Sequence, residues 1–152
     1  MRRGARSVMK WFAALYVVAI VVQVFLAGAG IFGLNNIKHA DDCDKNPAIC
    51  AGGSGTLDPH RTLGFFLTMP GALLFLIVAL LAWHPNMRIR VVSIALPFLA
   101  FFQMILAGLP RWLAALHPVN AMLLLGLFGW VAYRLRQEQP EEAVAAVPVA
   151  AD

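Results

Sequence analysis

Four long apolar segments constrain this chain more than any other feature of its sequence. They cover about residues 11–34, 61–83, 91–109 and 111–133, and no Asp or Glu lies within them. Each approaches the roughly 20 residues with which an α-helix crosses the hydrocarbon core of a membrane. Hydrophobic residues make up 61% of the chain and charged residues only 13%, far from the balance of soluble domains. The sequence therefore predicts an all-α integral membrane protein folded as one four-helix bundle.

The longer polar parts of the chain are a basic N-terminus at 1–10, a loop at 35–60 and a tail at 136–152, and a short basic loop at 84–90 joins the second span to the third. The tail is rich in Glu, Ala, Val and Pro and has no helical stripe, so we expect it to be disordered. A cleaved signal peptide is the alternative for the first segment, because a basic start precedes the apolar run. That run continues to Leu34, which favours a retained helix.

Several residues suggest where the spans begin and bend. Asp58 is expected to cap the second span. Prolines are expected to kink this span near Pro70 and to interrupt the third at Pro97. Asn120 is expected to cap the fourth span or to bond to the backbone near Pro118.

The distribution of Lys and Arg predicts that both termini are cytoplasmic. This orientation places eight basic residues inside: Arg2, Arg3, Arg6, Lys10, Arg88, Arg90, Arg134 and Arg136. It leaves four outside: Lys38, Lys45, Arg61 and Arg111. Basic residues are enriched in cytoplasmic segments, so we expect the 35–60 loop on the outer side of a plasma membrane.

Two histidines begin apolar segments on this outer side. His60 precedes the second span and His117 lies near the start of the fourth. Two imidazoles at one depth of a helical bundle are the axial ligands that a b-type haem needs. Interfacial histidines without a ligand are the alternative. His39 lies in the loop and His84 on the opposite side, so neither is expected to bind the same group.

A short repeat links the two histidines. Residues 23–28 read Gln-Val-Phe-Leu-Ala-Gly and residues 103–108 read Gln-Met-Ile-Leu-Ala-Gly, and each copy precedes a span that carries a histidine. The chain can therefore be read as two pseudo-repeated helix pairs. A pseudo-twofold bundle of this kind would bring His60 and His117 together across its axis.

Other residues could complete such a site. Arg61 and Arg111 are candidates to bind the propionates of a haem, or else lipid headgroups. Gln23 and Gln103 could bond across helices or to the edge of a cofactor. Gly64, one turn after His60, would allow close helix packing or leave space for a porphyrin.

Cys43 and Cys50 lie in the same loop. A disulfide between them is expected in an oxidising compartment, with two free thiols as the alternative. The absence of a carboxylate within the spans argues against a proton-driven transporter. The sequence also lacks a nucleotide-binding motif, and its basic residues lie at segment ends, which argues against nucleic acid as a partner.

The pattern resembles heme A synthases. It rests on His60-Arg61-x-x-Gly64, on the upstream pair Cys43 and Cys50, and on Gln103-x-x-Leu-x-Gly108 before a histidine of the fourth span. The chain is also similar to a family of small four-span bacterial membrane proteins with His-Arg-x-x-Gly and His-Pro-x-Asn-Ala motifs. Together these resemblances cover nearly all of residues 23–121.

The resemblance implies a haem between histidines of the second and fourth helices and a disulfide between Cys43 and Cys50. Two departures matter. The chain has half the length of a synthase, which implies one haem site or a homodimer. The synthases also carry a glutamate three residues before the histidine, where this chain has Leu57.

The sequence therefore predicts a membrane protein that binds haem b through His60 and His117. Electron transfer, haem handling or redox sensing beside a respiratory complex are the expected roles. A non-catalytic accessory or assembly subunit without a cofactor is the first alternative, and a haem-modifying enzyme is the second. Whether the protein is an enzyme is left open by the sequence.

Overall fold

The computed structural model describes residues 2–35 and 57–138, except for the side chains of residues 32–35 and 111. Every element within these ranges is helical. In chain order they are α1 (Arg2–Asn35), α4 (Asp58–Phe66), the π-helical turn η1 (Leu67–Gly71), α5 (Ala72–Ala82), α6 (Met87–Ala107), α7 (Arg111–Ala114) and α8 (Leu116–Gln137). The prediction of an all-α chain is confirmed for the described residues.

Four segments of the described chain are long and apolar enough to cross a membrane: Arg2–Ile31, Asp58–Ala82, Met87–Ala107 and Trp112–Gln137. Large apolar side chains cover their outward surfaces; Phe25 is 71% exposed and Met122 is 74% exposed. Exposure of this kind in every span is unsuited to water and suited to lipid. The chain is a multi-pass membrane protein.

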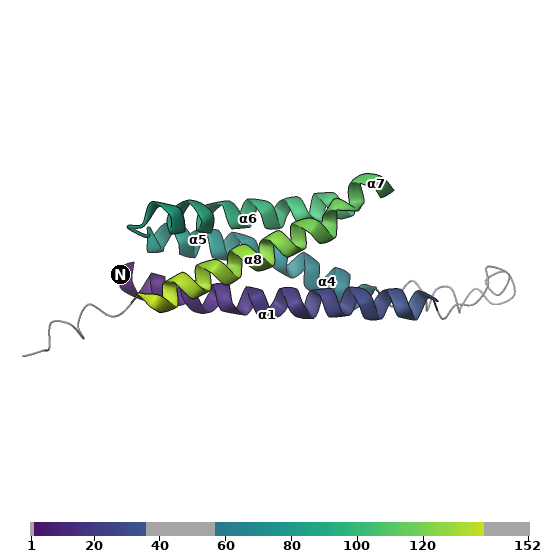
Figure 1. Cartoon of the computed structure of the whole chain (residues 1–152), viewed down its shortest axis with the longest axis horizontal. Coiled ribbons are helices and arrows are strands. Elements are labelled where there is room, and N and C mark those ends of the chain that lie inside the picture. Colours follow the sequence, from purple (N-terminus) through teal and green to yellow (C-terminus); the bar gives the residue numbers. More distant parts are fainter. Residues whose placement is uncertain (1, 36–56, 139–152) are drawn as a thin grey trace, which may run out of the picture.

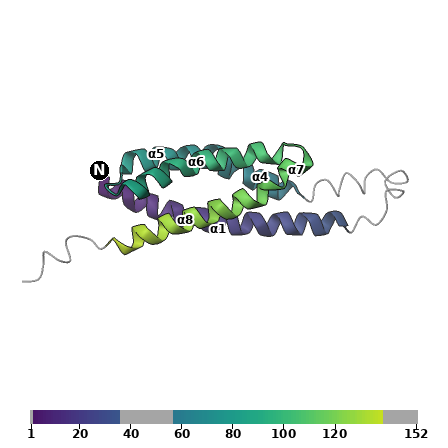
Figure 2. The same ribbon diagram turned by 45° about the horizontal axis from the view of Figure 1, so that its top comes forward.

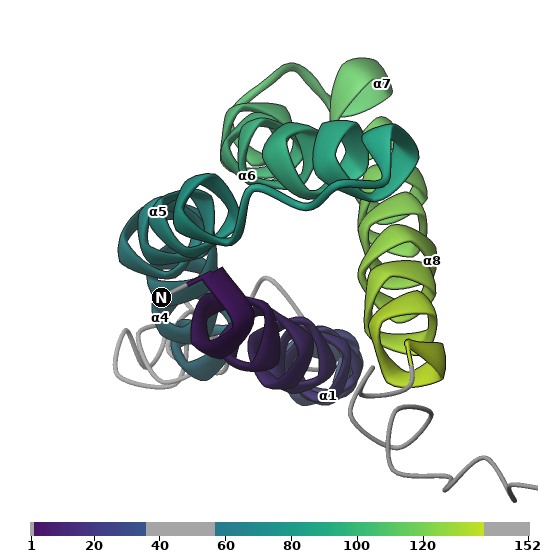
Figure 3. The same cartoon turned by 90° about the vertical axis from the view of Figure 1, so that its left-hand side faces the viewer.

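The long helices form a four-sided bundle in which α1, α5, α6 and α8 follow one another around the axis (Figure 3). The N-terminus, the turn between α5 and α6 and the end of α8 share one end of the bundle (Figure 1). The helices α4 and α7 lie at the other end (Figure 2). Both ends of the described chain therefore lie on one side of the membrane.

Aromatic rings fill the middle of the bundle. Tyr16 of α1 stacks on Phe128 of α8, with ring centres 4.3 Å apart and an angle of 9° between the planes. Phe75 of α5 contacts both rings edge-on, at 5.8 Å and 5.0 Å. Offset or edge-on aromatic contacts are favourable beyond the area that they bury. This cluster joins three of the four sides of the bundle.

The expected break near Pro70 is the π-helical turn η1. Proline has no N–H, so backbone carbonyls before it need other donors in a membrane. The Tyr16 hydroxyl donates to the carbonyl of Leu67 at 2.8 Å, and Thr68 Oγ1 donates to the carbonyl of Gly64 at 2.8 Å. A Cβ at position 71 would lie 2.6 Å from the Tyr16 hydroxyl, so Gly71 allows this contact.

The helix bounds differ from the predicted spans, most of all in the first and the fourth. The first helix begins at Arg2 rather than at residue 11, because the basic segment packs on the bundle. Met9 and Ala13 are buried, and Arg6 Nε donates to the carbonyl of Ala82 at 3.4 Å. The predicted fourth span is divided into α7 and α8, and α8 continues to Gln137, so the predicted tail begins with helix.

Two local predictions were wrong. Asp58 does not cap the second span; Leu57 precedes the helix without a side-chain cap, and Asp58 is its first residue. Pro97 does not interrupt the third span, because α6 runs through it. Pro97 is buried, and packing in the bundle compensates for the lost backbone bond.

Replacement of Tyr16 by Phe tests the role of its hydroxyl at the π-helical turn. We expect the Tyr16→Phe variant to lose about 1–2 kcal/mol of unfolding free energy, because the Leu67 carbonyl loses its donor in an apolar surrounding. Unfolding by denaturant in a fixed detergent measures this loss. Tyr133→Phe is the matched control, since Tyr133 is 58% exposed; equal effects of both variants would contradict the assignment.

Candidate functional site

A cavity of about 360 Å³ opens between α1, α4 with η1, α6 and α8. This volume lies within the range of small-ligand sites. Six residues predicted for the site line it: Gln23, His60, Arg61, Gly64, Gln103 and His117. The remaining walls are mostly apolar and include the stacked pair Tyr16 and Phe128. The structure thus brings together residues that lie far apart in the sequence.

Each histidine of the cavity exchanges two hydrogen bonds with one glutamine. Gln23 Nε2 donates to the carbonyl of His60 at 2.7 Å, and His60 Nδ1 lies 3.0 Å from the carbonyl of Gln23. Gln103 Nε2 donates to the carbonyl of His117 at 2.9 Å, and His117 Nδ1 lies 3.1 Å from the carbonyl of Gln103. The expectation that both glutamines bond across helices is confirmed.

These contacts determine the tautomer of both rings. A carbonyl oxygen only accepts, so Nδ1 of His60 and of His117 must carry the proton. In the neutral ring, Nε2 then presents a lone pair. The two ring centres lie 6.3 Å apart, with an angle of 65° between the planes. Histidines that bind metals through Nε2 usually donate Nδ1–H to a carbonyl or a carboxylate in this way.

One buried side-chain acceptor of the cavity has no donor among the described residues. Tyr16, Thr68 and the two glutamine amides donate to backbone carbonyls. The buried Gln23 Oε1 has no hydrogen-bond partner among the described residues. This lone pair, and those on the Nε2 atoms of His60 and His117, suit a metal ion or a hydrogen-bond donor.

Gly64 and Arg61 occupy different parts of the cavity wall. A Cβ at position 64 would lie 2.7 Å from Gln23 Nε2, so Gly64 lets the glutamine amide reach the carbonyl of His60. The side chain of Arg61 is 64% exposed, and its ion pair with Asp58 is long, at 3.4 Å. Its guanidinium is available to an anionic group at the mouth of the cavity.

Asn120 was expected to cap α8 or to bond to the backbone near Pro118, and this prediction was wrong. It is buried, and its Nδ2 donates to the carbonyl of Leu99 at 3.1 Å and to Gln103 Oε1 at 2.7 Å. This places Asn120 beside the His117 pair. The position follows from the packing of α8 on α6, which the sequence pattern did not reveal.

Some residues considered for the site lie outside the part of the chain that the structure describes. Cys43, Cys50 and His39 lie outside the described residues, and Arg111 begins α7 with a side chain that is also outside them. Residues 2–35 and 57–138 contain no group of three or more His, Cys, Asp and Glu side chains that could hold a metal ion. A haem can be held by two histidines, because its macrocycle supplies the other ligands.

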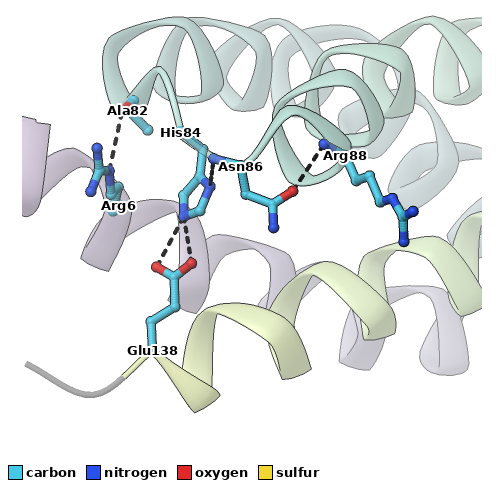
Figure 4. Close-up of polar contacts among 6 residues, drawn as sticks. All are labelled: Arg6, Ala82, His84, Asn86, Arg88 and Glu138. Carbon is cyan, nitrogen blue, oxygen red and sulfur yellow. Dashed lines mark hydrogen bonds and ion pairs between the residues drawn. The ribbon is translucent and has the colours of Figure 1, made fainter.

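A second polar cluster lies at the opposite end of the bundle (Figure 4). His84, which is 1% exposed, contacts both carboxylate oxygens of Glu138 through Nε2, at 2.8 Å and 2.9 Å. The backbone N–H of Asn86 donates to His84 Nδ1 at 3.1 Å. Nδ1 is thus the acceptor and Nε2 carries the proton, so the neutral ring satisfies both contacts. The cluster ties the end of α8 to the turn between α5 and α6.

The sequence interpretation set His84 aside because of its side of the membrane and did not foresee its burial. The available signal was the dipeptide His84-Pro85 in a tight turn. In that turn Trp83 adopts a left-handed conformation with φ of 32°, and Asn86 caps α6 by accepting from Arg88 N. These constraints direct the His84 ring inward.

Alanine variants of His84 and Glu138 are expected to differ in stability. His84→Ala should lose about 2 kcal/mol of unfolding free energy, since it leaves the Asn86 N–H without its acceptor and opens a buried space. Glu138→Ala should lose less than about 1 kcal/mol, because this side chain is 45% exposed. Denaturant unfolding of both variants in one detergent measures the difference, and a larger loss for Glu138→Ala would contradict it.

Comparison with protein-family models, with curated proteins and with solved structures finds no match for this chain. The functional proposal therefore depends on the residues and contacts described above.

Proposed function

We propose that this protein binds one b-type haem between His60 and His117, near the outer face of the plasma membrane. The observation that carries the proposal is the pair of imidazoles in one cavity, each with Nδ1 bound to a backbone carbonyl. In both rings Nε2 remains as the ligand atom, which is the arrangement that favours metal binding.

The spacing of the rings supports axial ligation. Two imidazoles that bind one metal ion from opposite sides, each through a bond of about 2 Å, have ring centres roughly 6 Å apart. The measured separation of 6.3 Å fits this value. Because a porphyrin supplies four nitrogens itself, two protein ligands complete the coordination.

The walls of the cavity support a flat apolar ligand with an anionic edge. Gly64, Ala100, Ala107 and Ala121 line it without bulky side chains. The half-exposed guanidinium of Arg61 is a partner for the carboxylates of such a ligand. Aromatic rings of Tyr16 and Phe128 close the deep side.

Haem held by two histidines supplies one-electron chemistry, because both axial positions are filled. His60 and His117 would set its depth, Gln23 and Gln103 would orient the two histidines, and the apolar walls would exclude water. With both termini in the cytoplasm, as the basic residues favour, the site faces the outer compartment. We propose electron transfer beside another membrane protein as the role, with haem handling or redox sensing consistent with the same site.

From the resemblance to heme A synthases we carry over only the ligation of haem by His60 and His117. Leu57 stands where those enzymes carry a glutamate, so haem oxidation is not proposed. A cofactor-free accessory subunit is the outcome that a failure of haem binding would favour.

Absorption spectra of the detergent-purified protein test haem binding. The wild type should show a Soret band that sharpens on reduction with dithionite, together with a narrow α band. His117→Ala should lose at least about nine-tenths of the haem, because a metal ligand is removed. His84→Ala is the matched control and should retain it. Absence of a Soret band from wild type expressed with a haem precursor would contradict the proposal.

Replacement of Gly64 by Ala tests the hydrogen bond from the Gln23 side chain to the backbone carbonyl of His60. The added Cβ collides with Gln23 Nε2, so the bond to the His60 carbonyl should break and the affinity for haem should fall about tenfold. Titration of haem into the apoprotein measures the change. Gly28→Ala is the control in the same helix region as Gln23, since its Cβ meets nothing within 4 Å. Equal affinity of both variants would sink the assigned role of Gly64.

A further inference from the structure

The two histidine–glutamine pairs differ at one neighbouring position. Three residues after His117 lies Asn120, whose Nδ2 donates to Gln103 Oε1 at 2.7 Å. Three residues after His60 lies Leu63, which has no group to bond the equivalent oxygen of Gln23. Consistent with this, Gln23 Oε1 is buried without a partner among the described residues.

This difference affects how firmly each histidine is held. Asn120 also donates to the carbonyl of Leu99, so Gln103 belongs to a closed network that joins α6 to α8. Connected buried hydrogen bonds stiffen the groups that they join. Gln23 lacks such a brace, and its amide holds His60 by the reciprocal pair alone.

The helices that carry the histidines differ in the same sense. His117 lies on α8, in which six residues are buried: Asn120, Leu124, Phe128, Val131, Ala132 and Leu135. His60 lies on α4, a helix of nine residues of which none is buried. Segments with few buried contacts open at a lower free energy than well-packed ones. The support of His60 is therefore the weaker of the two.

A π-helical turn separates α4 from the rest of its span. This turn, Leu67–Gly71, contains Pro70, and two of the carbonyls at this break are bound by side chains, Tyr16 and Thr68, instead of by backbone N–H groups alone. Helix kinks and π-helical turns mark places where a helix can bend. The π-helical turn thus divides the span that carries His60 into two helices, α4 and α5.

We infer that His60 is the displaceable ligand of the pair and that the cavity on its side admits a small neutral diatomic molecule, with carbon monoxide as the probe. His117 is the permanent ligand. This inference rests on the proposed haem site and adds ligand exchange to it. In the haem-loaded protein His60 would give up its place as a ligand to the diatomic molecule, which replaces one neutral ligand by another and needs no oxidant or reductant.

Spectra of the reduced, haem-loaded protein under carbon monoxide test the inference. The wild type should convert to the spectrum of a ferrous carbon monoxide complex within the time of a manual experiment. The fraction of His60→Ala that holds haem should bind carbon monoxide at least about tenfold faster, because no internal ligand competes. A reduced low-spin spectrum that carbon monoxide leaves unchanged overturns the inference and leaves the haem site intact. A protein without a Soret band overturns the haem site itself.

An exchange of the two neighbouring residues tests which histidine moves. Leu63→Asn supplies the first pair with the amide that Asn120 supplies to the second, at the same spacing from the histidine. We expect this variant to bind carbon monoxide about tenfold more slowly than the wild type, as one added hydrogen bond would produce. Flash photolysis followed by rebinding measures the rate.

The reverse variant, Asn120→Leu, removes the brace from the His117 pair. It should lose haem more readily than the wild type, and the haem that remains should bind carbon monoxide at the wild-type rate. An unchanged rate in Leu63→Asn together with faster binding in Asn120→Leu would assign the displaceable ligand to His117 and overturn the inference. Haem content measured before each experiment identifies variants that have lost the site.

Discussion

The hydrogen bond from each imidazole Nδ1 to the backbone carbonyl of a glutamine is the interaction on which the site depends. It joins α1 to α4 through His60, and α6 to α8 through His117. The same bond places the proton on Nδ1 and leaves a lone pair on Nε2. The glutamine amides return the bond to the histidine carbonyls, so each pair is held at two points. Helix packing and ligand chemistry are thus determined by the same four contacts.

These hydrogen bonds contribute more to stability in a membrane than they would in water. Within hydrocarbon, a backbone carbonyl without a donor is costly, so side chains must complete whatever the helices leave open. Tyr16 and Thr68 do so at the π-helical turn, and Asn120 does so for Leu99. Gln23 Oε1, which is buried in the cavity, has no such partner among residues 2–35 and 57–138. The His60 side consequently combines a bend, sparse packing and a free acceptor, whereas the His117 side is braced.

Hydropathy was sufficient to predict four spans, because an apolar run of about 20 residues has few other uses. The Gln-x-x-Leu-Ala-Gly match and the positions of the two histidines also predicted that His60 and His117 lie together, and the structure places both in one cavity with Gln23 and Gln103. The reciprocal hydrogen bonds between each histidine and its glutamine could not be predicted from the sequence, because they depend on the rotation and depth of one helix against another. Asn120 and His84 were misjudged for the same reason: their partners, Gln103 and Glu138, lie on elements whose contact no local pattern specifies.

An experimental structure of the reduced, haem-loaded protein, with anomalous diffraction recorded at the iron absorption edge, tests the central claim most directly. The account predicts a single strong iron peak between the rings of His60 and His117, with Nε2 of His117 as a ligand. An iron peak at any other place, or protein crystals of full haem content without a peak in this cavity, would contradict it.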